Sequence, residues 1–130
     1  MPFQLSTTRN SNLDEGVWAD YGGSRFLISH TSNSKFQREL ARLQAPFRKQ
    51  IEKNTMDPDD TKSIVCKALS KHILKGWEKV VDADKNEVAY TSDIGYVALM
   101  NDEGLREFVQ EFSTELSNYR EQDIEDKGNS

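Results

Sequence analysis

The residues whose types and spacing could do chemistry lie in one polar stretch, DADKNEVAYTSD, which runs from Asp82 to Asp93. An EF-hand calcium loop takes oxygen ligands at its first, third, fifth and twelfth positions, and this stretch offers a carboxylate or amide oxygen at all four. Its sixth position, where glycine permits the sharp turn, holds Glu87. We therefore interpret the stretch as a solvated connector without a metal, and keep a calcium switch as an alternative.

The groups that could support acid, base or nucleophilic chemistry are His30, His72 and Cys66. His72 falls on an apolar stripe, which is typical of a hydrogen-bonded core histidine. Cys66 follows two apolar residues, which favours an inert buried thiol, and a single cysteine cannot form an internal disulfide. Ser32 to Lys35 match an acylating S-x-x-K pattern by letters only. These residues supply no nucleophile with a base and an orienting group, so we predict no enzyme and no cofactor.

Charge is distributed unevenly along the 130 residues, whose formal net charge is -5. Residues 34–54 hold six basic and two acidic side chains, whereas residues 102–127 hold nine acidic and three basic ones. The acidic total disfavours a general nucleic-acid binder, because neutralising phosphates takes clustered Lys and Arg. The sequence also has no run of about 18 apolar residues, so we expect no membrane contact and a cytoplasmic location.

Two charged stripes with a spacing of four residues are the candidate site. The first consists of Lys67, Lys71, Lys75 and Lys79, and the second of Glu103, Glu107, Glu111 and Glu115. On two helices, each stripe would lie opposite the apolar stripe of its helix. Either both are solvated faces, or they meet between subunits or on a partner, where charge pairs set orientation and encounter rate.

The elements that must position these residues begin with a hairpin over 16–30. In GVWADYGGSRFLISH, apolar residues alternate on both sides of a glycine turn. An isolated hairpin is barely stable, so its apolar face must cover other elements as a lid, or its edge must serve a neighbouring subunit.

Four helices are predicted after the hairpin. The first begins at Ser34, with a break at about Ala45 because Pro46 cannot continue it. The second has Asp57 as its N-cap and runs to about Val81. The third covers 93–100 with Ile94, Val97 and Ala98 facing inward, and the fourth covers 102–119.

The predicted fold class is therefore α+β, mainly α, with an N-terminal β-hairpin packed on a bundle of about four helices. One domain spans residues 16–119, with a flexible leader over 1–15 and a flexible acidic tail over 120–130.

The order of these elements resembles the tail assembly chaperones of long-tailed siphophages. The most specific parts are the Gly-Val-Trp opening of the hairpin, the Gly76-Trp77-Glu78 ending of the second helix, and the Asp-rich turn that leads to Tyr90-Thr91-Ser92. The family usually has a glycine in that turn, where this chain has Asn86 and Glu87. The resemblance covers residues 13–119 and includes no catalytic signature.

The resemblance implies a protein of the host cell cytoplasm that is not part of the mature virion. Such chaperones coat the tape measure protein, keep it soluble, and help the major tail tube protein polymerise around it. The resemblance also implies that many copies of the chain self-associate. The alternative within phage biology is another structural or adaptor protein, such as a minor tail component.

Overall fold

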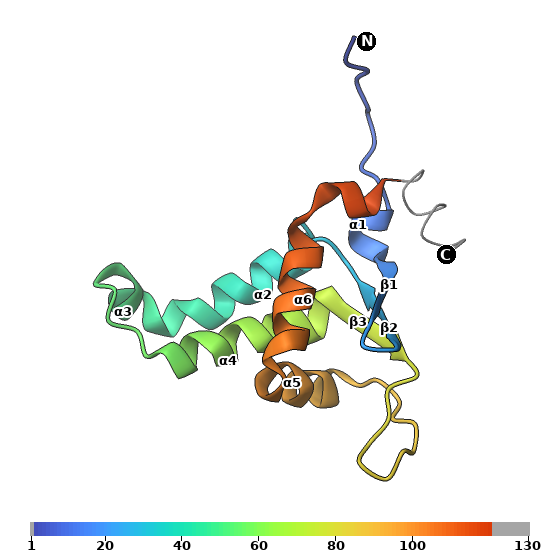
Figure 1. Cartoon of the computed structure of the whole chain (residues 1–130). Coiled ribbons are helices and arrows are strands. Elements are labelled where there is room, and N and C mark those ends of the chain that lie inside the picture. The colour runs from blue at the N-terminus through green and yellow to red at the C-terminus, as the bar shows by residue number, and fades with distance from the viewer. Residues whose placement is uncertain (1, 121–130) are drawn as a thin grey trace.

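The computed structural model describes residues 2–120, and its fold is α+β and mainly helical, as the sequence predicted (Figure 1). A three-stranded antiparallel sheet lies at one side and a helical arm extends away from it, while one further helix lies beneath the base of the arm and another crosses the arm there. The acidic tail predicted over 120–130 lies outside the described residues from position 121 onward. Among the described residues, no helix is both long and apolar enough to cross a membrane.

The predicted hairpin is confirmed as strands β1 (Val17–Tyr21) and β2 (Ser24–Ile28). Gly22 and Gly23 form its turn with φ angles of 60° and 82°, a left-handed conformation that glycine adopts without strain. Val17 pairs with Ile28, and their side chains are buried on the core face. Ahead of the hairpin, the short helix α1 (Asn12–Glu15) lies in the predicted leader.

The arm consists of residues 34–68 and is a helical hairpin. It contains α2 (Ser34–Gln44), a 3₁₀ turn (Ala45–Phe47), α3 (Arg48–Glu52) and α4 (Pro58–Ala68). The break at Ala45 is where Pro46 predicted it. Asp57 caps α4 by accepting the Asp59 amide at 2.7 Å, as predicted, and α2 begins at Ser34, as predicted, with Asn33 as its N-cap.

The prediction of one helix to Val81 is correct only as far as Ile73. The chain makes a π turn (Leu69–Ile73) and then becomes strand β3 (Leu74–Glu78), which pairs antiparallel with β2. Gly76 and Trp77 therefore lie in the sheet and not on a helix. The predicted two-stranded hairpin is accordingly part of a sheet of three strands, with the helices packed around it.

Two helices complete the fold after a connection over 79–91. Helix α5 (Ser92–Asn101) is capped by Thr91, and α6 (Glu103–Thr114) is capped by Asp102, whose carboxylate accepts the Leu105 amide at 3.0 Å. The predicted fourth helix ends early, at Thr114, and a 3₁₀ turn (Leu116–Tyr119) follows.

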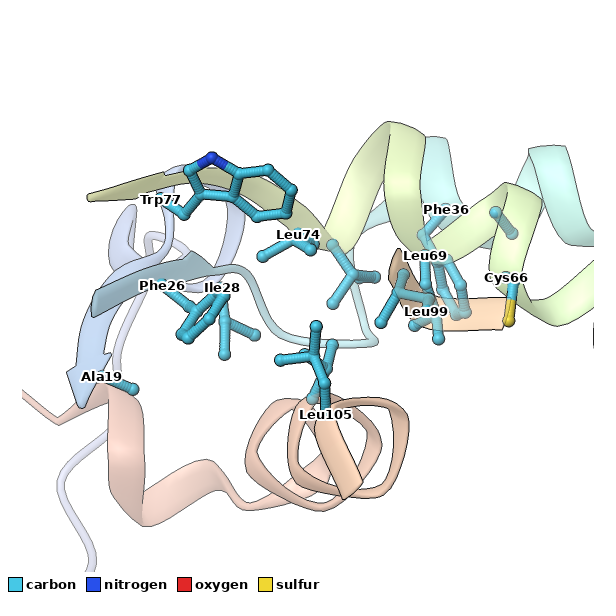
Figure 2. Packing of buried hydrophobic residues seen from close by; sticks show 13 residues of the cluster. Ala19, Phe26, Ile28, Phe36, Cys66, Leu69, Leu74, Trp77, Leu99 and Leu105 are labelled. Atoms are coloured by element: carbon cyan, nitrogen blue, oxygen red, sulfur yellow. The ribbon is translucent and has the colours of Figure 1, made fainter. Parts of the chain in front are cut away.

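The core lies where the sheet, the base of the arm, α5 and α6 meet. Figure 2 shows Phe26 and Ile28 on β2 pointing toward Leu105 of α6, while Leu69 and Leu99 pack together near the base of the arm. Burial of such side chains is the main stabilising contribution in a domain of this size. The core fixes α5 and α6 against the sheet, and this arrangement creates the surface described next.

Candidate functional site

An open groove of about 750 Å³ lies between the tip of the hairpin, the chain that leaves β3, and helix α5. Its lining is mainly apolar, with polar groups at the edges. The lining residues are Tyr21, Gly22, Gly23, Ser24, Phe26, Trp77, Lys79, Val80, Val81, Val97, Ala98, Asn101, Asp102 and Leu105. A groove of this size and composition is suited to apolar side chains of a ligand or of another polypeptide.

The α5 face, which we define as Ile94 and Val97, extends the apolar surface from Val97, which lines the groove, to Ile94 outside it. Ile94 is 41% exposed and Val97 is 54% exposed, and Val81 on the opposite wall is 51% exposed. The prediction that Ile94 and Val97 face inward is wrong, because Gly95 and Leu99 take the inner positions. Helix α5 is thus apolar on its inner and outer sides alike, which is unusual for a helix at the surface.

Tyr90 determines which side of α5 faces inward. A Cβ atom on Gly95 would lie 2.6 Å from the Tyr90 ring, so only glycine lets the helix approach so closely. The Tyr90 hydroxyl donates to the Leu74 carbonyl at 2.7 Å and also lies against the Ser70 carbonyl. This ring therefore joins α5 to the π turn and to the start of β3.

The other walls of the groove are held by aromatic contacts. Tyr21 stacks on Phe108 of α6 with a ring-centroid distance of 4.7 Å, and its hydroxyl reaches the space that a Cβ on Gly104 would occupy. Trp77 packs edge to face on Phe26 and donates its indole N–H to the Val88 carbonyl at 2.7 Å. These contacts join the hairpin to α6 and β3 to β2, and so fix the positions of the residues that line the groove.

The predicted lysine stripe does not exist as one face. Lys67 lies on α4 and Lys71 on the π turn, whereas Lys75 is on β3 and Lys79 follows β3 with a φ of 62°. Their spacing of four has meaning only on a continuous helix, and the helical stretch made by α4 and the π turn ends at Ile73, before Lys75 and Lys79.

Two of these lysines make intramolecular contacts. Lys71 binds Glu39 of α2 at 3.2 Å, and Lys75 donates to the Asp14 carbonyl at 2.9 Å. Hydrogen bonds from Arg42 and then Lys71 lower the pKa of Glu39 to about 2. Among the four lysines, Lys79 alone lines the groove.

The glutamate stripe is present on α6. Glu103, Glu107 and Glu111 are exposed there, while Glu115 lies just past its end and accepts the Ser117 hydroxyl at 3.1 Å. Within residues 2–120, no ion pair joins any of these glutamates to a lysine of the first set. The structure therefore does not bring the two predicted sets together within one subunit.

Of the titratable groups that suggested chemistry, His30 and Cys66 are buried, whereas His72, predicted to lie in the core, is only half-buried. His30 Nδ1 accepts the Ser32 amide at 3.0 Å, and its ring meets Tyr119 edge to face. Burial lowers the pKa of His30 and of His72 and raises the pKa of the Cys66 thiol. Cys66 is fully buried, as the apolar sequence around it predicted.

The Asp-rich stretch forms a self-capped turn between a strand and a helix, and an EF-hand requires two helices. The Asp82 carboxylate accepts the amides of Asp84 at 2.9 Å and Asn86 at 3.0 Å. Lys85 takes a φ of 66° in this turn. In the part of the chain that the structure describes, no group of three or more His, Cys, Asp and Glu residues is arranged to hold a metal ion.

Sequence reasoning missed the groove because its walls come from segments distant in the sequence. The only signal available was the composition of α5, which has six apolar residues over 94–100 and no polar face to turn outward. Such a helix has an outer side that another surface can cover.

A family model described as YdaY prophage protein matches residues 31–129, about three quarters of the chain. The chain belongs to this YdaY prophage protein family. A bacteriophage origin follows, which agrees with the phage resemblance of the sequence. The YdaY match begins after the hairpin, and it includes the arm, β3, α5 and α6. Comparisons with curated proteins and with solved structures gave no match.

Proposed function

We propose that this phage protein is a tail assembly chaperone, which binds the tape measure protein, keeps it soluble, and promotes polymerisation of the tail tube protein around it. Its place of action is the cytoplasm of the host cell, and it leaves before the virion is complete. Membership of a prophage family and the resemblance in element order support this proposal.

The single observation that carries the proposal is the uncovered apolar surface made by the groove and the α5 face. Ile94 and Val97 are three residues apart, so their side chains lie together on the outer side of α5. Exposed apolar patches that are flanked by polar residues mark protein interaction sites. A helix of the tape measure protein can lay its own apolar stripe along this surface, as amphipathic helices do in other grooves.

The proposal includes no catalytic activity. His30, His72 and Cys66 contribute to packing, and the groove lining contains no imidazole or thiol. A chaperone needs only to shield apolar surface that would otherwise aggregate, and a surface without reactive groups is sufficient for that.

Coexpression with the tape measure protein of the same prophage tests the proposal. We expect the wild-type chain to raise the soluble fraction of the tape measure protein and to co-purify with it. Val97→Asp should abolish both effects, because a carboxylate on the α5 face would be buried without a partner. Leu116→Asp is the matched control, since Leu116 is 56% exposed on the 3₁₀ turn after α6.

Two results would contradict the proposal. The first is equal solubility of the tape measure protein with and without the chain. The second is the presence of the chain in purified virions, which would favour a minor tail component instead. Circular dichroism and thermal unfolding of Val97→Asp establish that the variant is folded.

A further inference from the structure

A basic patch lies at the base of the arm, where α2, the π turn, the start of β3 and the leader meet. Asn33 joins two of these elements, because its Nδ2 donates to the His72 carbonyl at 3.2 Å while its Oδ1 caps α2. Lys71 of the π turn reaches Glu39 of α2 at 3.2 Å. Six exposed basic side chains, three of them spaced by three and four residues along one face of α2, make up the patch: Arg9, Lys35, Arg38, Arg42, Lys71 and Lys75.

The lysines of the patch are close enough to act on one imidazole. Burial lowers the pKa of His72, and Glu39 raises it. The charges of Lys71, Lys35 and Lys75 each lower this pKa further. The patch is therefore a single region of positive potential, although its residues come from separate elements.

Acidic side chains are fewer in the patch. Asp14 is held by Arg9 through two hydrogen bonds of 3.0 Å, and Glu39 is held by its two salt bridges within the patch. Glu15, which follows on α1, is exposed. The next acidic residue of β3, Glu78, pairs within the sheet. Six basic groups against three acidic ones leave a surplus of three positive charges at this surface.

The acidic tail of the chain begins beside this patch. The carbonyl of Tyr119, the last residue but one that the structure describes, accepts Asn10 Nδ2 at 2.8 Å. Four residues further along the leader, the Asp14 carbonyl accepts Lys75 Nζ at 2.9 Å. Figure 1 shows the 3₁₀ turn that ends in Tyr119 next to α1. One turn of the leader thus connects the start of the tail with the edge of the patch.

The composition and length of the tail match the patch. Residues 121–130 hold four acidic side chains and one basic side chain, Lys127. Ten extended residues span up to about 33 Å, whereas the basic side chains of α2 are spread over only about 10 Å of helix. The YdaY family model includes both partners, since it runs from residue 31 to residue 129.

From these observations we propose that the basic patch binds the chain's own acidic tail, residues 121–126. Exposed charge pairs are individually weak, but a short tether gives the tail an effective concentration in the millimolar range. Several weak pairs are then sufficient for docking, and other anionic ligands must displace the tail to reach the lysines. The inference goes beyond the proposed chaperone function, because the patch lies at the start of β3 and the groove at its end.

Paramagnetic relaxation measured by NMR in the full chain tests the inference. A nitroxide is attached to the variant Gly128→Cys, and the native Cys66 stays unlabelled because it is fully buried. We expect the nitroxide to broaden the amide signals of Phe36 and His72 at low salt. The broadening should disappear at about 1 M salt, where the screening length falls to about 3 Å.

Three variants of the labelled chain distinguish docking from simple proximity. The tail-neutral variant keeps the tether and defines the broadening by an unbound tail; its changes are Glu121→Gln, Asp123→Asn, Glu125→Gln and Asp126→Asn. Lys35→Gln/Lys71→Gln should lower the docking equilibrium constant roughly fivefold, the effect of two exposed pairs. The matched control, Lys49→Gln/Lys53→Gln, removes two exposed lysines at the far end of the arm (Figure 1) and should behave as the wild type.

Three results would overturn the inference. The first is equal broadening in the wild type and the tail-neutral variant, and the second is an equal loss in the control and in Lys35→Gln/Lys71→Gln. The third is broadening of an isotope-labelled chain by the nitroxide of a second chain mixed with it, which would place the tail on another copy. None of these measurements involves the tape measure protein, so failure of the chaperone proposal shows separately.

Discussion

Replacing Tyr90 by phenylalanine tests how the chain changes from helix to strand between Ala68 and Leu74. The Tyr90 hydroxyl donates hydrogen bonds to the carbonyls of two buried residues, Ser70 and Leu74, at the two ends of the π turn. Phenylalanine keeps the ring against Gly95 and removes only the hydrogen-bond donor.

The expected loss follows from leaving buried acceptors without this donor. An unsatisfied buried polar group costs about 1–3 kcal/mol. We expect Tyr90→Phe to lower the free energy of unfolding by about 2 kcal/mol, since one hydroxyl proton is shared by two carbonyls. For a domain of this length, that corresponds to a fall of roughly 5–10 °C in Tm.

Urea denaturation followed by tryptophan fluorescence measures this loss, because Trp77 packs edge to face on Tyr90 at a centroid distance of 4.9 Å. The slope with denaturant should be unchanged, since the same surface is exposed on unfolding. Tyr96→Phe is the control, because the Tyr96 hydroxyl meets only the Ser63 hydroxyl, at 2.9 Å and partly exposed. A Tyr90→Phe variant no less stable than Tyr96→Phe would refute the role given to this hydroxyl.

Two further predictions concern the same elements. Gly95→Ala should lower the free energy of unfolding by about 1–3 kcal/mol, because its Cβ would lie 2.6 Å from the Tyr90 ring; calorimetry measures this, and a more stable variant would contradict the packing described. Burial raises the pKa of Tyr90 and Tyr119 above the value of about 10 in the unfolded chain, so the unfolded chain loses protons first and stability falls as pH rises above about 10. The loss should approach about 1.4 kcal/mol per pH unit for each tyrosine, and Tyr90→Phe should halve it in alkaline urea titrations.

The sequence was sufficient for elements whose signals are local. Alternation around Gly22 and Gly23 predicted the hairpin, Pro46 predicted the break in the arm, and Asp57 predicted the start of α4. Each of these depends on the conformational preference of one or two residues, which neighbouring elements do not override.

The sequence was insufficient where a distant partner decides the structure. Residues 65–80 have apolar side chains at helical spacing, yet Leu74–Glu78 form β3 because the outer edge of β2 offers unpaired backbone groups. Gly76 was the residue in this segment that argued against a helix, since glycine costs about 1 kcal/mol inside a helix. The same applies to α5, where an all-apolar sequence defines no inner side until Tyr90 occupies the space beside Gly95.

The change from helix to strand also creates the candidate site. A helix continued to Val81 would have aligned four lysines on one face and left β2 with an open edge. The π turn instead brings Trp77 onto Phe26 and carries Val80 and Val81 past the hairpin tip, opposite Val97 of α5. An apolar groove replaces a charged stripe at this position. The open apolar groove is suited to contact with a polypeptide, because Val81 and Val97 on its walls are each more than half exposed.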